Sequence, residues 1–119
     1  MIEILSMAIN TDDFIIGWDI EVSLHKEPTA KMFFEKAVLV LSIDAIEHFM
    51  DHAMKSNQEV KVTISNSFNS HKQLTFDPFS APKVLKDDPI ALLMEVIDDC
   101  IHEFLKNPDK EDYGEEEEC

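Results

Sequence analysis

Hydrophobic and polar residues alternate most regularly in the segment 14–24. Its apolar residues occupy every second position and are Ile16, Trp18, Ile20, Val22 and Leu24. A period of two is typical of a strand with one buried face. Weaker versions of the pattern predict strands near 59–65 and 73–77. The segment 2–9 is apolar on both faces, which predicts a strand, with a short helix as the alternative. A run at 32–41 is apolar on both faces in its second half, which predicts a central or doubly covered strand.

Two other segments repeat their apolar residues every three or four positions, which predicts helices near 43–56 and 89–106. Either Ser42 or Asp44 is suited to cap the first helix, and Asp88 is suited to cap the second. The second helix is the longest amphipathic segment of the chain, so we expect it to pack along the sheet.

The predicted elements follow the order β-β-β-α-β-β-α. This order favours a single α+β domain over 1–106, in which two helices pack on an antiparallel five-stranded sheet. A chain of 119 residues is long enough for one core. The residues predicted to fill it are Trp18, Ile20, Val22, Leu39, Ile46, Met50, Val62, Ile64, Phe76, Ile97, Ile101 and Phe104.

The chain is strongly acidic. It has 25 acidic and 10 basic residues, a formal net charge of −15, and all its basic residues are Lys. Such a surface repels nucleic acid, because binding to phosphates depends on Lys and Arg. It attracts basic proteins and makes their association fast and salt-sensitive. The segment 107–119 contains four consecutive Glu, which predicts an acidic, disordered tail.

The strongest candidate for a binding surface is the outer side of the helix predicted at 89–106. Its carboxylates are neighbours at helical spacing and belong to Glu95, Asp98, Asp99 and Glu103. They lie about 6 Å apart, a scale similar to that of a nucleic-acid strand, which carries roughly one charge per 3.4 Å. We therefore expect this helix to fit a groove built for a phosphate backbone. A solvated helix face is the competing interpretation.

Three further residues complete the predicted partner surface. Leu92 lies within the acidic side and is a candidate apolar anchor, unless the loop 79–85 covers it. Asp19 and Glu21 lie on the exposed face of the strand predicted at 14–24, where they extend the negative surface.

Other reactive residues do not combine into a catalytic or metal site. His48 and His52 share one side of a helix, but only aspartates lie near them in sequence, so surface histidines are the better interpretation. Cys100 and His102 point to opposite sides of their helix and cannot share an ion. The chain has only two Gly and no phosphate-binding loop. We therefore predict no enzyme activity, no cofactor and no bound metal.

Cysteine usage and hydropathy predict a cytoplasmic protein. Two Cys give no disulfide framework, which favours a reducing compartment. No segment approaches the ~20 apolar residues of a membrane span. The N-terminal residues lack the pattern of a signal peptide.

These features predict a small acidic binding protein that inhibits or neutralises a basic partner. One form would be a nucleic-acid mimic that blocks a nuclease or a defence complex, and another an immunity-type inhibitor of a toxin. The alternative comes from a resemblance. In size, acidity and predicted element order, the chain resembles the small dimeric chaperones that hold secreted effector proteins, although that family usually begins with a helix. The resemblance implies a homodimer that holds its effector in an apolar groove.

Overall fold

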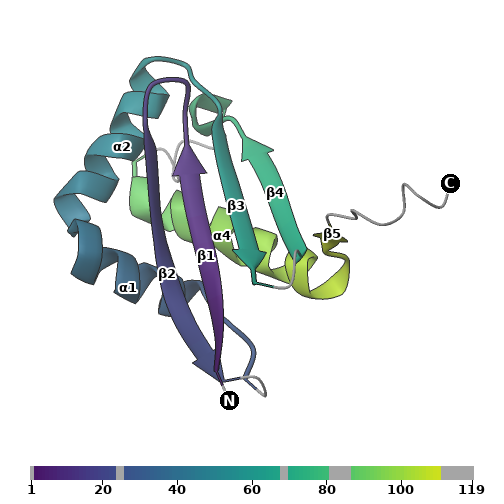
Figure 1. The fold of residues 1–119 in the computed structure, drawn as a ribbon. Helices are drawn as coiled ribbons and strands as arrows, with labels where there is room; N and C mark the ends of the chain where they lie inside the picture. Colours follow the sequence, from purple (N-terminus) through teal and green to yellow (C-terminus); the bar gives the residue numbers. More distant parts are fainter. Residues whose placement is uncertain (1, 24–25, 68–69, 81–86, 111–119) are drawn as a thin grey trace, which may run out of the picture.

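A four-stranded antiparallel sheet forms one layer of the molecule (Figure 1). The computed structural model describes residues 2–23, 26–67, 70–80 and 87–110. The strands are β1 (Ile2–Asn10), β2 (Ile15–Ser23), β3 (Val60–Asn66) and β4 (Ser70–Phe76), and a two-residue strand, β5 (Asp109–Lys110), adjoins β4. The order β2-β1-β3-β4-β5 places β2 at one edge of the sheet.

Helices form the second layer, on one face of the sheet. They are α1 (Ala30–Leu41), α2 (Ile43–Lys55), the short 3-10 helix η1 (Pro78–Ser80) and α4 (Pro89–Lys106). α4 packs against β3 and β4, whereas α1 packs against β2. In Figure 1, α1 and α2 extend to the left of β2, beyond the edge of the sheet. The other face of the sheet carries no helix among the described residues.

The prediction of a five-stranded sheet with two helices is wrong at residues 32–41, which form most of helix α1. The domain remains α+β, but it has four full strands and, among the described residues, three α-helices. Thr29 caps α1, because its Oγ1 accepts a hydrogen bond from the Met32 N–H at 3.2 Å. The buried residues of α1 are spaced three and four apart: Ala30, Phe33 and Ala37. Leu39, predicted to be in the core, is 81% exposed.

The remaining predicted helices and strands are confirmed, with ends shifted by up to three residues. Of the two residues suited to cap α2, Ser42 does so, since its Oγ accepts a hydrogen bond from the Ala45 N–H at 3.2 Å. Asp88 caps α4 through an Oδ1 that accepts from the Ala91 N–H at 3.1 Å. Ser42 also ends α1 with a φ of 83°, so one residue separates the two helices.

The core lies between the sheet and the helices. Every predicted core residue is buried except Leu39 and the half-buried Phe76. Trp18 joins the two layers on the β2 side, where its Nε1 donates to the Phe33 carbonyl of α1 at 2.9 Å. A buried indole N–H needs such a partner, so the pairing fixes α1 beneath β2.

Cys100 lies in the core between α4 and the sheet. Its Sγ is 3.6 Å from the Val62 carbonyl oxygen and 3.5 Å from that of Lys72. Burial raises the pKa of the Cys100 thiol to about 11. The thiol is therefore protonated at neutral pH and acts as a packing group.

Asp109 and Lys110 belong to the segment predicted to be disordered, yet they pair with His71 and Ser70 of β4. Lys72 supports this arrangement: its Nζ donates to the Asn107 carbonyl at 3.3 Å and lies 3.8 Å from Asp109 Oδ1. The rest of the predicted tail, residues 111–119, lies outside the described residues.

Candidate partner-binding site

The predicted acidic surface forms the outer side of α4. Its four carboxylates, those of Glu95, Asp98, Asp99 and Glu103, are all exposed. The opposite side of this 18-residue helix is buried against the rest of the fold through Leu92, Leu93, Ile97, Cys100, Ile101 and Phe104. The helix backbone is thus held firmly by the core while the carboxylates extend into solvent. We call these four residues the α4 acidic face.

No ion pair neutralises the α4 acidic face within the described part of the chain. The four ion pairs found there join other residues. Only His102 and Lys106 offer basic groups on the same exposed part of the helix. Like charges three or four positions apart on a helix cost roughly 0.2–0.5 kcal/mol per pair. A basic partner would offset this repulsion.

Leu92 does not belong to this surface. Its side chain is 6% exposed and forms part of the core, so the residue predicted as an apolar anchor is not accessible to a partner. Val96 is half-buried and packs against the same core. The exposed apolar residue of the helix is Leu105, near its C-terminal end. The centre of the α4 acidic face therefore offers charge rather than apolar contact.

Asp19 and Glu21 are exposed but lie on a different surface. Trp18 and Ile20 point into the core, so the alternation of β2 directs Asp19 and Glu21 to the uncovered face of the sheet. Ser6 Oγ donates to Asp19 Oδ1 at 2.7 Å across the neighbouring strand. The sheet separates these carboxylates from α4. The single surface predicted from sequence is therefore divided between two sides of the molecule.

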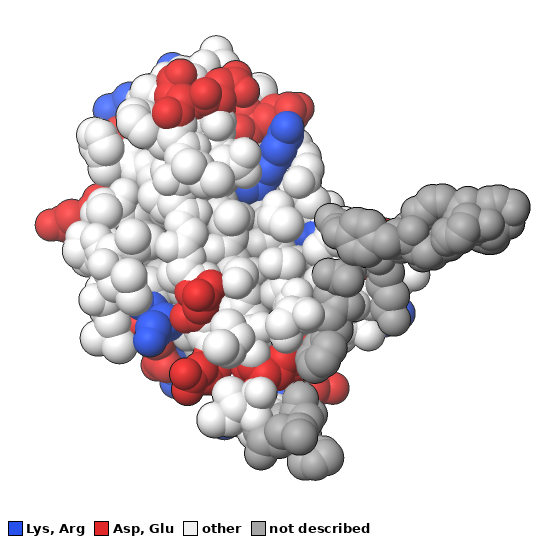
Figure 2. Space-filling model, in the orientation of Figure 1, with Lys and Arg blue, Asp and Glu red and all other residues white. Residues whose placement is uncertain are grey.

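The uncovered face of the sheet carries little charge despite the net charge of the chain. The outward-facing residues of β1, β3 and β4 are mostly small or uncharged, and include Ser6, Ala8, Thr63, Ser65, Gln73 and Thr75. Figure 2 shows this face as a broad uncharged area with carboxylates gathered toward its upper and lower ends. The acidity of the protein is thus unevenly distributed.

A second candidate site, which sequence analysis missed, follows the free edge of β2. A hollow of about 410 Å³ is lined by Trp18, Asp19, Ile20 and Glu21 of β2 together with Lys36 and Val40 of α1. A smaller hollow of about 150 Å³ is lined by Phe14, Ile15 and Ile16 together with Ala45, His48 and Phe49 of α2. Both hollows lie along β2 beside the helices, and the larger one also reaches Ile4 of β1. We call the two together the β2 slot.

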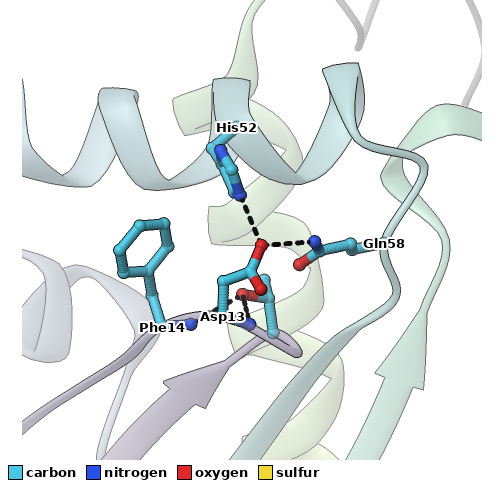
Figure 3. A network of polar contacts seen from close by, with 5 residues as sticks. Asp13, Phe14, His52 and Gln58 are labelled. Atoms are coloured by element: carbon cyan, nitrogen blue, oxygen red, sulfur yellow. Dashed lines mark hydrogen bonds and ion pairs between the residues drawn. The ribbon is translucent and has the colours of Figure 1, made fainter.

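A polar network joins the turn before β2 to the end of α2 (Figure 3). His52 Nε2 lies 3.0 Å from Asp13 Oδ2, and Gln58 Nε2 donates to the same oxygen at 2.7 Å. Thr11 Oγ1 accepts hydrogen bonds from the N–H groups of Asp13 and Phe14. The Phe14 ring meets the His52 ring edge-on, with 4.9 Å between centroids. These contacts fix the turn against α2 at one end of the β2 slot.

Chemically, this network is a structural clamp. The hydrogen bond from Gln58, followed by that with His52, lowers the pKa of the Asp13 carboxyl below its usual value of 3.8. His52, predicted to be a surface histidine, is only partly exposed, whereas His48 is exposed. Across the residues that the structure describes, no group of three His, Cys, Asp or Glu is placed to hold a metal ion.

Comparison with known proteins assigns no family, since no family model, curated protein or solved structure matches the chain. Among the described helices, none has the length and apolar character needed to cross a membrane. The function is therefore argued from the two surfaces described above.

Proposed function

We propose that this protein is a cytoplasmic binding protein that inhibits or neutralises a basic partner through the α4 acidic face. The observation that carries the proposal is a row of four exposed carboxylates on a core-anchored helix, with no ion pair to neutralise them among the described residues. The chain acts by occupying a surface rather than by catalysis.

The favoured partner is a protein that itself binds nucleic acid, such as a nuclease, a defence complex or a toxin. A groove that binds phosphates is lined by Lys and Arg, and a helix that presents regularly spaced carboxylates complements that charge. The chain itself does not bind nucleic acid, because its charge of −15 repels phosphates.

Charge dominates this interaction because Leu92 is buried and supplies no anchor. Electrostatic complementarity acts mainly through the association rate and through specificity. We therefore expect fast association at low salt and a steep decline as salt is added.

A dimeric chaperone is the second candidate. It is favoured by the exposed apolar residues near the β2 slot, among them Ile15, Val40 and Ile43. The element order that first suggested it does not hold, because α1 replaces the predicted third strand. The α4 acidic face supports the first candidate more directly.

The test reverses two charges of the face, Glu95→Lys with Asp99→Lys. Partners captured from a cell extract by the immobilised chain are purified, and association rates are measured at low and high salt. We expect the double variant to associate about 10-fold or more slowly than the native chain at low salt, and the two rates to converge at high salt.

The control is Asp12→Lys with Glu59→Lys, which changes the net charge equally at two exposed positions outside α4. It should slow association far less than the α4 variant. If both double variants slow association to the same extent, only the net charge matters and the assignment to α4 is wrong.

A further inference from the structure

We propose that the β2 slot binds an extended segment of a basic protein, which adds to the sheet as a strand beside β2. The segment has apolar and basic residues in alternation. This inference depends on the proposed function only for the sign of the partner's charge. Its site lies at the sheet edge and does not include the α4 acidic face.

The backbone of β2 is available for pairing. This nine-residue strand pairs with β1 along its whole length on one side. On its other side, none of the described strands pairs with it. An edge strand directs every second pair of N–H and C=O groups outward. Proteins often protect such edges with Pro or with charged residues, especially Lys. Ile15–Ser23 contains no Pro or Lys, and its charged residues are both carboxylates.

The helices provide a floor for an added strand. α1 and α2 extend past the edge of β2 in Figure 1, so the helix layer is wider than the sheet on this side. Val40 of α1 lines the larger hollow and is 55% exposed. Ala45 of α2, which is also exposed, lines the smaller one. An added strand would cover these apolar groups with its inward-facing side chains.

The carboxylates of β2 determine which residues are favoured on the outward face of the added strand. Asp19 and Glu21 point to the uncovered side of the sheet, so an added strand would place its outward residues beside them. Opposite charges on neighbouring strands attract, and like charges repel. Lys or Arg is therefore favoured at the outward positions of the bound segment, and apolar residues are favoured at the inward ones.

The same charges argue against a second copy of this chain as the occupant. Pairing of β2 with β2 of another copy would bring two sets of Asp19 and Glu21 to the same face of one continuous sheet. Each copy also carries a net charge of −15. Both the local and the overall charge therefore disfavour self-pairing.

The positive charge of Lys36 lies beside the proposed site and disfavours binding of a basic segment. It lines the larger hollow beside Asp19 and Glu21, and also an adjoining hollow with Glu35 and Met32. A cation at this position attracts the two carboxylates and repels a basic segment. Replacement of Lys36 by a neutral residue should therefore strengthen binding. If Lys36 only contacted the ligand, its replacement would weaken binding instead.

The probe is a peptide of about eight residues with Val and Lys in alternation, a typical strand length. Its control has the same composition, with all Val followed by all Lys. We expect the alternating peptide to bind at least about 10-fold more tightly, because only it places Val inward and Lys outward in an added strand. Amide hydrogen exchange should slow at β2 on binding and stay unchanged at β4.

Two matched pairs of variants locate the site. Val40→Lys should weaken binding of the alternating peptide about 10-fold, whereas Leu39→Lys, an equal change at an 81% exposed position beside it, should change it less than about two-fold. Lys36→Ala should strengthen binding about 2- to 5-fold. Lys31→Ala, on the same helix but paired with Glu35, should have little effect.

Equal binding of the two peptides, without slower exchange at β2, would show attraction by charge alone and overturn the proposal. Failure of the alternating peptide to bind, together with a dimer that Val40→Lys dissociates, would also overturn it and assign the edge to a second copy. Glu95→Lys with Asp99→Lys should leave peptide binding within about two-fold of native, allowing for the change in net charge. The two proposals can therefore fail independently.

Discussion

The two edges of the sheet differ in how their backbone groups are covered. At one edge, the first two residues of β4 pair with β5, and Lys72 holds the chain that leads to β5 through Asn107 and Asp109. At the other edge, β2 presents nine residues that no described strand covers. The same fold thus covers the beginning of one edge with its own chain, whereas no described strand pairs with any part of the other.

The helix layer differs in the same way. α4 packs under β3 and β4 and reaches the C-terminal segment that covers β4. α1 and α2 instead extend beyond β2 and leave apolar residues exposed beside it. Unprotected edge strands promote unwanted pairing. An open edge with an apolar floor and carboxylates alongside is therefore better explained as a site for a particular ligand.

The largest expected effect is on the stability of the fold when the packing of α4 under β3 and β4 is disturbed. Ile97 is fully buried in α4, so Ile97→Ala should lower the free energy of unfolding by about 2–5 kcal/mol. Urea denaturation measures the change. Ile97→Val is the matched control and should cost about 0.5–1.5 kcal/mol. If Ile97→Ala costs no more than Ile97→Val, α4 does not pack as described.

Those elements that follow a single clear period could be predicted from the sequence. The alternation around Trp18 and Ile20 identified β2, and the helical spacing of Ile97, Ile101 and Phe104 identified α4. In both cases one face is buried and the other is polar, so burial appears directly in the residue pattern.

Helix α1 was not predicted because the exposed residues of its second half, Leu39 and Val40, are apolar, although the exposed residues before them are charged. Phe33 and Ala37 are buried, so the run 37–41 is apolar on its buried and its exposed side. Such a short run does not distinguish a strand from a helix. The outward residues that obscured the period are among those beside the β2 slot, so the failed prediction and the missed site have one cause.

The predicted exposure of the candidate residues was correct where exposure follows from helical spacing alone. Glu95 and Asp99 are exposed as expected, but Leu92 sits close to the boundary between the two sides of α4, and packing decides its burial. Asp19 and Glu21 were placed correctly on an exposed strand face. Their separation from α4 depends on which face the helices cover, and local sequence does not contain that information.

A moderate effect is expected when the closed edge is loosened. Lys72→Met keeps an unbranched side chain in a half-buried position but removes the contacts with Asn107 and Asp109. The free energy of unfolding should fall by about 0.5–1.5 kcal/mol, the contribution of one hydrogen bond. The ion pair adds little to this, because Asp109 is largely exposed.

Amide hydrogen exchange distinguishes the two edges in this variant. Exchange at His71 should accelerate, while exchange in β2 and at Ser70, whose N–H donates to Asn66 Oδ1, should not change. Lys61→Met, at an exposed position of β3, is the matched control and should affect neither edge. Equal acceleration at both edges would indicate that Lys72 stabilises the whole sheet rather than the pairing of β5.

The smallest expected effect concerns pH at the turn before β2. The pKa of the Asp13 carboxyl lies below 3.8, because Gln58 and then His52 bond to its charged form. A lowered pKa in the folded state adds stability above the unfolded value, and this stability is lost as pH falls through the folded value. Acid should therefore loosen the turn and the adjoining end of β2 as the pH falls below 3.8.

Gln58→Met tests the cause of this shift. The pKa of Asp13, followed by the NMR shift of its carboxyl carbon, should rise toward 3.8, since the largest contribution to its lowering is removed. His52→Phe should also raise it, because it removes the hydrogen bond and the coulombic interaction with His52, while keeping an aromatic ring beside Phe14. In both variants, loosening of the turn should begin at a higher pH than in the native chain. If neither variant changes the titration of Asp13, the network in Figure 3 does not hold this end of the β2 slot.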